Sequence, residues 1–316
     1  MSARRAARVA VIGVGHLGRH HARIYAGMEN VELAGVVDIQ QARAEEVALS
    51  HKTRPFTDYH DVLGKVDAVS LAVPTIDHAR IGLDLLSRGI DVLVEKPIAA
   101  TLDEARELDA RAAETGRILQ VGHVERFNPV VTAAREVATR PQFFEIHRLA
   151  AFSPRSLDID VVLDLMIHDL DIVLDLVRSR VTEVRAVGIP VLSKRADIAN
   201  ARIEFQSGCV ANLTASRVSF ERMRKLRFFQ PHDYISIDYA SQRGTVVSLR
   251  MGRVIERKLE PAEQEPLKLE LQSFIESVQT RRPPLVTGED GVKALELGLR
   301  INEEIDRKSR SNVLER

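Results

Sequence analysis

The feature that most constrains the fold is a regular alternation of short apolar segments and longer amphipathic segments over the first 120 residues. The short segments are rich in β-branched residues and are typical of buried strands. The longer ones, such as "HARIGLDLLSRG" and "LDEARELDARAAETG", have the apolar spacing of helices. Buried strands that alternate with helices predict a parallel, doubly wound sheet. The predicted strands are residues 8–15, 31–38, 68–74, 92–97 and 117–123.

The first predicted strand ends in a glycine-rich turn. Gly13, Gly15 and Gly18 form the pattern G-x-G-x-x-G before a helix, and Asp38 closes the second strand 20 residues after Gly18. Such glycines permit a tight turn and let backbone N–H groups approach a pyrophosphate, while the acidic residue binds the adenosine ribose. The alternative is that the glycines only pack a helix on a strand. We expect a Rossmann domain that binds NAD rather than NADP, because no arginine is placed near Asp38 to meet a 2′-phosphate.

The pattern changes after residue 140. Many segments now alternate apolar and polar residues, which predicts an antiparallel sheet with one face covered by helices. We therefore predict an α/β protein with an NAD-binding Rossmann domain over residues 1–122 and an α+β domain with a large, mostly antiparallel sheet over residues 123–316. Two late helices are predicted at about 264–280 and 288–308, and a family resemblance, carried by the motifs given below, implies that they pack back on the first domain. The strands predicted for the second domain are residues 143–152, 182–192, 200–206, 209–218, 225–230, 234–240 and 244–250.

One predicted helix, from about 160 to 177, is apolar except for a stripe of aspartates and one histidine. Spacings of four, four, three and four residues place the stripe on one face. Asp164 and His168 are one turn apart, so the carboxylate can fix the tautomer of the imidazole and raise its basicity. The alternatives are that early aspartates only stabilise the helix dipole, or that His168 is a core histidine. The stripe consists of Asp160, Asp164, His168, Asp171 and Asp175.

Composition narrows the class of partner. Lysine plus arginine number 45, as do aspartate plus glutamate, so nothing indicates binding to nucleic acid or an anionic membrane. The chain has one cysteine, Cys209, and its first residues lack the apolar segment of a signal peptide. No apolar run approaches the roughly 20 residues that span a bilayer. The single cysteine favours a cytoplasmic protein. No second histidine is spaced to share a metal ion with His168, so we expect no metal site.

Several motifs, spread in order over nearly the whole chain, resemble the family of glucose–fructose oxidoreductase and inositol dehydrogenase, called Gfo/Idh/MocA. The most specific pair is "VEKP" (94–97) followed about 70 residues later by Asp-x-x-x-His. The resemblance implies an NAD-dependent enzyme that oxidises the CH–OH group of a sugar or polyol, with Lys96, Asp164 and His168 as catalytic residues. Either Lys96 or His168 is then the base that takes the hydroxyl proton. The other motifs are "VIGVGHLGRHHA", "AVPTIDHA", "VGHVERFNP", "VLDLMIHDLDI" and "GEDGVKALEL".

The motif "GHVERFNP" (122–129) looks like the version in enzymes that oxidise the 3-hydroxyl of UDP-N-acetylglucosamine, upstream of a 3-amino sugar for lipid A or envelope glycans. A UDP-sugar needs cations at its pyrophosphate, and arginine suits this contact. The residues implied for the cofactor are Gly13, Gly15, His16, Leu17, Gly18, Asp38, Pro74, Thr75, His78, Glu95 and Lys96. Those proposed for the substrate are Arg126, Asn128, Arg148, Arg155, Asp164 and His168, with Arg217 as a further candidate.

Two other functions stay open: a dehydrogenase of a free sugar or inositol, and a non-catalytic protein that senses NAD. Asp158, Ile159 and Asp160 stand where many family members carry a Gly-Gly run, so the sugar pocket can differ. We also expect a homodimer or homotetramer formed through the second sheet, because a large apolar patch is seldom left exposed on a monomer. The candidates for that patch are Ile203, Phe205, Val210, Leu213, Phe228, Phe229, Tyr234 and Tyr239.

Overall fold

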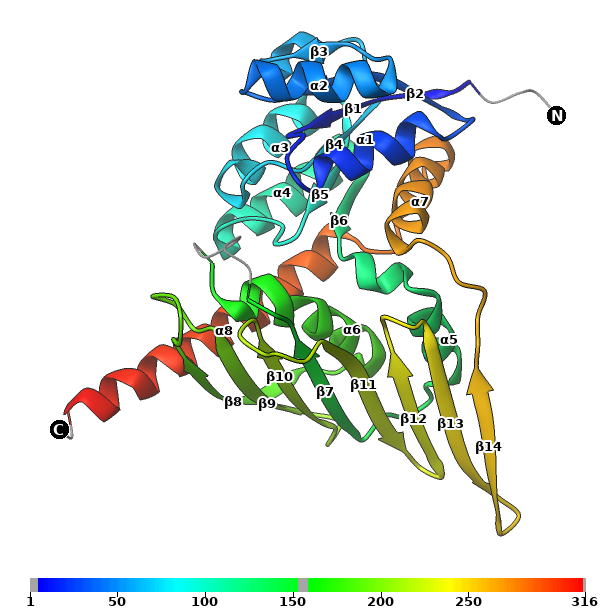
Figure 1. Cartoon of the computed structure of the whole chain (residues 1–316), viewed down its shortest axis with the longest axis vertical. Coiled ribbons are helices and arrows are strands. Elements are labelled where there is room, and N and C mark those ends of the chain that lie inside the picture. The colour runs from blue at the N-terminus through cyan, green and yellow to red at the C-terminus, as the bar shows by residue number, and fades with distance from the viewer. Residues whose placement is uncertain (1–4, 153–158, 315–316) are drawn as a thin grey trace. The chain divides into compact units, whose positions relative to one another are not determined.

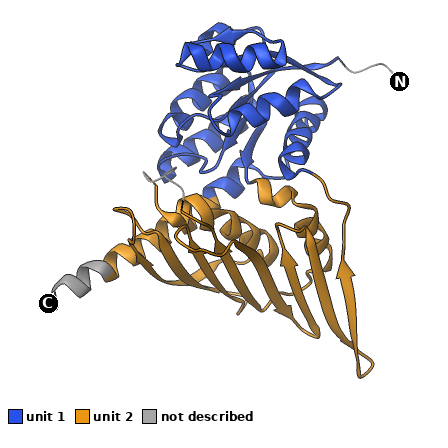
Figure 2. Cartoon of the chain, in the orientation of Figure 1, with its two compact units in different colours: residues 1–123, 265–292 blue, residues 124–264, 293–316 orange. Residues whose placement is uncertain are grey.

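The computed structural model describes residues 5–152 and 159–314 (Figure 1). The chain divides into two compact units, coloured separately in Figure 2. The predicted boundary between residues 122 and 123 lies one residue before the first break, but the predicted second domain includes a later segment that belongs to the first unit. The first unit contains residues 1–123 and 265–292, and the second contains residues 124–264 and 293–316.

The first unit is built on a six-stranded sheet with the strand order β3-β2-β1-β4-β5-β6. All neighbouring strands are parallel, so the predicted doubly wound parallel sheet is confirmed. β4 and β5 are buried along their whole length, as expected for central strands covered on both faces. The strands are β1 (Ala7–Ile12), β2 (Val31–Val37), β3 (Pro55–Phe56), β4 (Ala68–Leu71), β5 (Asp91–Glu95) and β6 (Leu119–Gly122).

The helices of the first unit begin and end at recognisable capping signals. At the start of α4, Thr101 Oγ1 accepts a hydrogen bond from the Glu104 N–H, and the Glu104 carboxylate accepts one from the Thr101 N–H. Gly116 ends this helix in the left-handed conformation. The helices are α1 (Gly18–Ala26), α2 (Gln41–His51), α3 (His78–Ser87), α4 (Leu102–Thr115) and α7 (Pro266–Thr280).

Helix α7 comes from far along the chain but completes the core of the first unit. Its residues Leu271, Phe274 and Ile275 are buried in one cluster with Val9 of β1 and Tyr25 of α1. Helix α8 (Gly288–Leu314) begins in the first unit and continues through the second. The first unit is therefore formed by two segments of the chain, and all strands of the second sheet lie between these segments in the sequence.

The second unit is built on an eight-stranded sheet with the order β14-β13-β12-β11-β7-β10-β9-β8. Its neighbouring strands are antiparallel except for β7 and β10, which are parallel. The predicted large, mostly antiparallel sheet is thus confirmed. Strand β14 was not predicted, because charged residues interrupt its apolar positions. The strands are β7 (Phe143–Leu149), β8 (Val181–Ile189), β9 (Ile198–Phe205), β10 (Val210–Ser216), β11 (Met223–Gln230), β12 (Asp233–Asp238), β13 (Arg243–Arg250) and β14 (Arg253–Leu259).

The two faces of this sheet differ in polarity. One face is packed into a core that includes Phe144 and Val130, the latter from helix α5 (Pro129–Val137), which the sequence analysis did not predict. On the opposite face Glu145 pairs with Arg227 at 3.1 Å. Side chains two residues apart along a strand share a face, so a patch drawn from consecutive residues mixes the two faces.

The predicted patch for association is therefore wrong in most of its members. Alternation turns the large apolar residues of β9 to β12 toward the buried face. Val210, Phe229 and Tyr234 lie on the other face, and the Phe229 ring contacts Tyr234 in a tilted arrangement at a centroid distance of 5.0 Å. The members buried in the core are Ile203, Phe205, Leu213, Phe228 and Tyr239.

The helix predicted at 160–177 is present in two parts. Val162–Met166 form a π-helical turn, η4, and Ile167–Val177 form the regular helix α6. A π-turn rotates the side chains that follow it, and such turns are frequent at functional sites. Asp160 caps the first part, because its Oδ1 accepts hydrogen bonds from the N–H groups of Val162 and Leu163, both at 3.0 Å.

Candidate functional site

The turn between β1 and α1 is shaped by its three glycines. Gly13 has a φ of +84°, and a Cβ there would lie 2.7 Å from the carbonyl oxygen of Ala72. A Cβ on Gly18 would overlap the carbonyl oxygen of Gly13, so packing explains both of these glycines. Gly15 is different, because a Cβ there would meet nothing within 4 Å. Packing does not explain the glycine at position 15. The open backbone there fits the close approach of a dinucleotide pyrophosphate.

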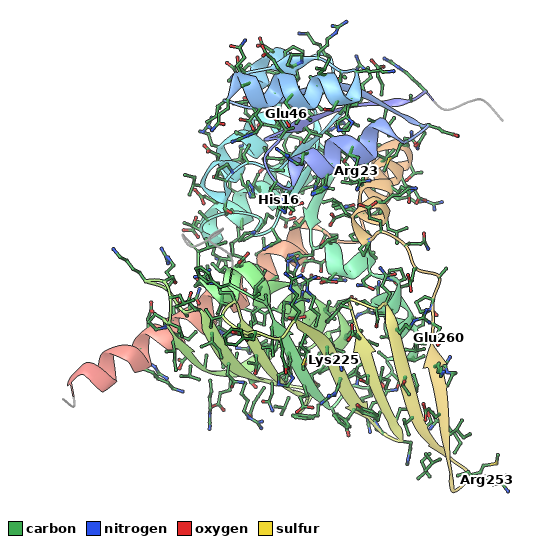
Figure 3. The ribbon with its side chains drawn as sticks, viewed as in Figure 1. His16, Arg23, Glu46, Lys225, Arg253 and Glu260 are labelled. Carbon is green, nitrogen blue, oxygen red and sulfur yellow. The ribbon has the colours of Figure 1, made fainter. Side chains whose placement is uncertain are left out.

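His16 and Leu17 complete this turn and have exposed side chains; His16 is labelled in Figure 3. The carbonyl oxygen of Leu17 accepts hydrogen bonds from the N–H groups of His20 and His21, which starts helix α1. The predicted cofactor residues from Gly13 to Gly18 are therefore one continuous strand–turn–helix connection. This arrangement presents backbone N–H groups at the N-terminus of a helix, where anions bind.

Asp38 follows β2 and is fixed beside the glycine turn. Its carboxylate accepts hydrogen bonds from the N–H groups of Val14, at 3.1 Å, and Gln40, at 2.9 Å. Arg43 Nη1 lies 3.3 Å and 3.2 Å from the two carboxylate oxygens. The expectation that no arginine is placed near Asp38 is therefore wrong, because the first turn of α2 brings a residue five positions later back to it. Asp38 itself stands where this fold binds the adenosine ribose.

Glu95 ends β5 and Lys96 follows it, with its side chain half-buried. Glu95 is buried, with Oε1 3.0 Å from His21 Nε2 and Oε2 accepting the Lys96 N–H at 3.3 Å. Burial by itself would raise the pKa of Glu95, but His21 and Lys96 outweigh this effect and hold the pKa below its ordinary value. A charged Glu95 thus supports the backbone of Lys96 at the carboxyl edge of the sheet, where open α/β sheets bind ligands.

Pro74 and Thr75 lie between β4 and α3, at the same edge of the sheet. His78, the first residue of α3, is buried, and its ring nitrogens lie 2.9 Å from the carbonyl oxygens of Pro97 and Val73. Burial lowers the pKa of His78, although the two carbonyls oppose that effect. His78 therefore joins the loops that follow β4 and β5, and its predicted contact with the cofactor stays a prediction.

In the second unit, Asp164 lies within the π-turn η4 and His168 in the first turn of α6. Both side chains are half-buried. The N–H of Asp164 donates to the carbonyl oxygen of Asp160 at 3.0 Å. The catalytic roles of both residues stay predictions.

The last two members of the polar stripe form buried ion pairs. Arg126 Nε and Nη2 donate to the two oxygens of Asp171 at 2.7 Å and 3.1 Å. Its Nη1 lies 3.0 Å from Asp175, which also pairs with Arg135. The carboxylates of Asp171 and Asp175 thus anchor α6 to Arg126 and Arg135, so these two of the five stripe members have a structural role.

Asp169 holds a second buried arginine. Arg148 Nε and Nη2 donate to its two oxygens at 2.7 Å and 2.8 Å, and Nη1 donates to Glu125 at 2.9 Å. The Tyr239 O–H also donates to Asp169, and the Arg148 guanidinium lies 5.1 Å from the Tyr239 ring centroid. Burial opposes the charge of Arg148, but Asp169 and Glu125 outweigh it and raise the pKa of Arg148 well above its ordinary value.

These contacts give Arg126, Asn128 and Arg148 structural partners, which count against their predicted contact with the substrate. Each arginine is buried and neutralises carboxylates that would otherwise be unpaired in the interior. Asn128 Oδ1 caps α5 by accepting the Val130 N–H, and its Nδ2 donates to the carbonyl oxygen of Tyr239. The sequence could not reveal these partners, because they lie on elements far apart in the chain. Arg155 lies outside the described residues.

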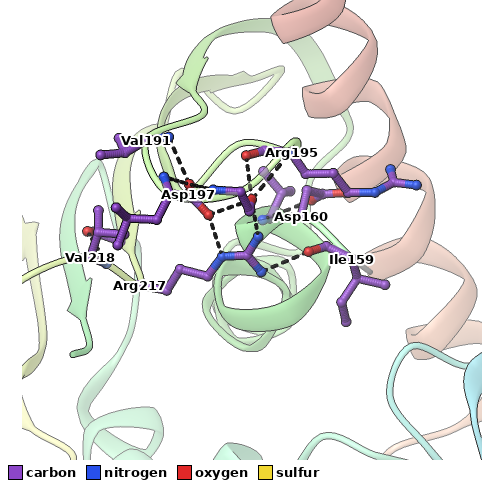
Figure 4. A network of polar contacts seen from close by, with 11 residues as sticks. Ile159, Asp160, Val191, Arg195, Asp197, Arg217 and Val218 are labelled. Carbon is purple, nitrogen blue, oxygen red and sulfur yellow. Dashed lines mark hydrogen bonds and ion pairs between the residues drawn. The ribbon is translucent and has the colours of Figure 1, made fainter. Parts of the chain in front are cut away.

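Arg217, the further candidate, belongs to the network drawn in Figure 4. Its Nε donates to Asp197 at 2.8 Å and its Nη1 to the carbonyl oxygen of Ile159 at 2.8 Å. Asp197 also accepts the N–H groups of Val191, Leu192 and Ser193. Arg217 therefore fixes the backbone that leads into η4. Sequence reasoning missed Asp197, which no local motif distinguishes.

The residues that the structure describes also bear on metal binding and on membrane insertion. Among them, no group of three or more His, Cys, Asp or Glu side chains is arranged to hold a metal ion. In the same residues, no helix combines the length and apolar character needed to cross a membrane.

Two family models match the chain. Residues 7–123 match the oxidoreductase family model with an NAD-binding Rossmann fold, and residues 138–237 match the C-terminal domain model of the GFO/IDH/MocA family. The first match contains the glycine turn, Asp38 and Lys96, and the second contains η4 and α6.

Similar proteins of full length are dehydrogenases. The chain is 38% identical to a UDP-N-acetylglucosamine 3-dehydrogenase of Acidithiobacillus ferrooxidans, over 93% of this chain and 96% of the relative. A solved structure of that dehydrogenase has a TM-score of 0.91 at 37% identity, covering 96% and 98% of the two chains. The chain is 29% identical to a scyllo-inositol 2-dehydrogenase (NAD(+)) of Bacillus subtilis, over 92% of each chain.

A more distant structure, scyllo-inositol dehydrogenase from Lactobacillus casei with NAD(H) and scyllo-inositol, has a TM-score of 0.83 at 18% identity over 96% of this chain and 98% of that one, a likeness of fold alone. Both domain types and the order of the motifs agree with the resemblance found in the sequence. The protein is an NAD-dependent oxidoreductase that acts on a CH–OH group. The chain belongs to the Gfo/Idh/MocA oxidoreductase family.

Proposed function

We propose that the enzyme oxidises the 3-hydroxyl of a UDP-N-acetylhexosamine, UDP-N-acetylglucosamine in particular, to a 3-keto sugar. The observation that carries this proposal is the 38% identity with a UDP-N-acetylglucosamine 3-dehydrogenase over nearly the full length of both chains. The motif "GHVERFNP" supports the same substrate class. A 3-keto sugar is the substrate that an aminotransferase needs to make a 3-amino sugar, so a role in lipid A or other envelope glycans belongs to this proposal.

The residues proposed for the chemistry are Lys96, Asp164 and His168. His168 takes the proton of the 3-hydroxyl, and the C–O single bond becomes a carbonyl as hydride leaves C3. When bound, NAD supplies the nicotinamide ring that accepts this hydride. Lys96 stabilises the negative charge that develops on the substrate oxygen, and Asp164 orients His168. Either Lys96 or His168 can be the base in this step, because both residue types accept and donate protons in enzymes.

The pyrophosphate of the substrate needs cations other than the buried arginines. Arg126, Arg148 and Arg217 already bind carboxylates of the second unit. Of the arginines named from the sequence, Arg155 is the one that we still propose for this contact. Binding energy from the UDP part would then be remote from the reacting carbon, so free N-acetylglucosamine is expected to be a poor substrate.

The second candidate is a dehydrogenase of a free polyol or sugar. It is favoured by the 29% identity with a scyllo-inositol 2-dehydrogenase over 92% of both chains. The two candidates differ in the need for a nucleotide on the substrate.

The test is NADH formation with UDP-N-acetylglucosamine, free N-acetylglucosamine, glucose and myo-inositol. A ketone trap or a coupled aminotransferase should be present, because oxidation to the ketone can be uphill. Turnover of the UDP-sugar with little on the free compounds supports the proposal. Efficient turnover of a free sugar or inositol, with none on the UDP-sugar, favours the second candidate. A protein that binds NAD but oxidises nothing in the panel would support a sensing role.

A further inference from the structure

A group of polar side chains is buried between the first sheet and helices α1 and α7. Its members come from five different elements and face the same side of the sheet. Ser70 pairs with Leu93, and Leu93 with Gln120, in one row across β4, β5 and β6, and Glu95 lies two residues beyond Leu93. The members are His21 and Tyr25 from α1, Ser70 from β4, Glu95 from β5, Gln120 from β6 and Glu270 from α7.

Glu270 is the anomaly in this cluster. Its exposed fraction is 0%, and neither oxygen of its carboxyl group has a hydrogen-bond partner among the described residues. Gln120 Nε2 donates to the backbone carbonyl oxygen of Glu270 at 3.1 Å, while Gln120 Oε1 is also without a partner there. An ionised carboxylate in such a position would be very costly, because the side chain is fully buried and no donor among the described residues compensates its charge.

Glu95 is the charged carboxyl of the cluster. It lies 3.0 Å from His21 Nε2, and His21 Nδ1 lies 2.7 Å from Ser70 Oγ, to which Tyr25 also donates. Gly122 leaves room for this carboxylate, since a Cβ there would lie 2.9 Å from Glu95 Oε2. Glu95 therefore has the partners that a buried negative charge requires.

Two carboxyl groups in one buried cluster cannot both ionise without strong repulsion. Burial raises the pKa of Glu270 well above its ordinary value, and the negative charge of Glu95 adds to the effect. The titratable side chains that face the pair are His21 and Tyr25 on α1, while Lys96 and His78 act on Glu95. Strand β1 presents apolar Val9 and Val11 to the same face.

We propose that Glu270 is a neutral carboxylic acid at neutral pH and acts as a positioning residue for Glu95, so that the two buried carboxyl groups behind Lys96 hold one proton and one negative charge. The neutral acid lets Glu95 keep its contact with His21. It also keeps Glu95 Oε2 in place to accept the Lys96 N–H. Ionisation of Glu270 would displace Glu95 and, with it, the backbone of Lys96.

The effect of pH on stability follows from the raised pKa of Glu270. Between the ordinary pKa of 4.5 and the higher value in the folded state, the folded protein holds a proton that the unfolded chain has lost. The stabilisation is therefore complete below the ordinary value and is lost as the pH rises toward the folded value. A glutamine at this position has the same shape and no proton to lose.

The experiment compares Glu270→Gln with the wild-type protein and with Glu276→Gln, which removes an exposed carboxyl from the same helix. We expect the melting temperature of the Glu270→Gln variant, relative to wild type, to rise by about 2–5 °C per pH unit between about pH 5 and pH 9. Glu276→Gln should show no such trend. A difference that stays constant with pH for Glu270→Gln would overturn the proposal.

Infrared spectroscopy tests the protonation state of Glu270 directly and needs no substrate. At neutral pH the wild-type spectrum should contain the carbonyl band of a protonated carboxylic acid, and this band should be missing from Glu270→Gln but retained in Glu276→Gln. Absence of that band from the wild-type protein would refute the neutral acid even if the glutamine variant folded poorly.

The link to turnover rests on the proposed catalytic role of Lys96 and is measured separately. The wild-type kcat should fall at alkaline pH, and Glu270→Gln should lose this step while its kcat at neutral pH stays within about threefold of wild type. An identical alkaline profile in the two proteins would overturn the positioning role. The stability and infrared results do not depend on which substrate the enzyme uses. Failure of the proposed function can therefore be distinguished from failure of the proposal that Glu270 is a neutral acid.

Discussion

At the scale of single residues, we expect Asp38 and its partner Arg43 to determine which dinucleotide is preferred. The Asp38 carboxylate repels a 2′-phosphate, whereas Arg43, with 35% of its side chain exposed, reduces that repulsion. We predict tighter binding of NAD than of NADP. Asp38→Ala should lower the ratio of the NADP dissociation constant to the NAD dissociation constant, and Arg43→Ala should raise this ratio by several-fold to about tenfold. Dissociation constants for both cofactors provide the measurement, with Arg54→Ala, an exposed arginine of the same unit, as control. Equal constants in the wild-type protein would contradict this assignment.

Lys96 and His168 are predicted to act on the reacting carbon. Lys96→Ala and His168→Ala should each lower kcat by about two orders of magnitude or more, the scale of lost proton transfer or oxyanion stabilisation. Their affinity for NAD should change little, and steady-state kinetics beside NAD titration measures both quantities. The control is Lys268→Ala, an exposed lysine on α7. Whichever variant keeps near-wild-type turnover loses its place among the catalytic residues.

Arg148 is predicted to contribute to stability rather than to substrate binding. Arg148→Ala would leave Asp169 and Glu125 buried without their counter-ion, which typically costs about 3–5 kcal/mol. The neighbouring Arg224, opposite Arg148 on β11, is exposed, and its alanine variant should behave like wild type. Thermal unfolding of the two variants measures the difference. A stable Arg148→Ala variant with weakened binding of UDP-N-acetylglucosamine would instead restore the phosphate role.

At the scale of elements, the sequence predicted those that carry a strong pattern. Apart from the two-residue strand β3, which was not predicted, the strands and helices of the first unit follow from buried β-branched runs, glycine signals and caps such as Thr101 with Glu104. Strand β14 and helix α5 were missed, because the first is largely charged and the second is only nine residues long. Their formation depends on neighbours in the fold, which no local pattern contains.

The segment formed by η4 and α6 shows the same limit for the candidate site. Its polar stripe was visible in the sequence, but spacing alone could not separate structural from functional carboxylates. Asp171 and Asp175 are explained by Arg126, which lies 45 residues before Asp171. The π-turn that contains Asp164 also has no signal in the spacing of apolar residues. The polar residues of the candidate site could therefore be predicted from the sequence. Their hydrogen-bond and ion-pair partners could be identified only in the folded structure.

At the scale of the whole molecule, we expect self-association through the face of the second sheet that carries Phe143, Phe229 and Tyr234. Phe229 is 38% exposed and contacts both other rings, at centroid distances of 5.8 Å and 5.0 Å. Light scattering at micromolar concentration should give the mass of a dimer or tetramer, and Phe229→Asp should reduce it. Phe220→Asp, at a fully exposed phenylalanine, serves as control. A wild-type protein with the mass of one chain would refute this expectation.

The central claim, that the enzyme removes hydride from C3 of UDP-N-acetylglucosamine, is tested most directly with substrate deuterated at that carbon. The reaction is run with NAD and a ketone trap, and the reduced cofactor is analysed by mass spectrometry, with His168→Ala as the inactive control. We predict that NADH formed by the wild-type enzyme contains one deuterium per molecule and that the sugar product is a 3-ketone. NADH without deuterium, or no NADH from the UDP-sugar while myo-inositol is oxidised, would contradict it.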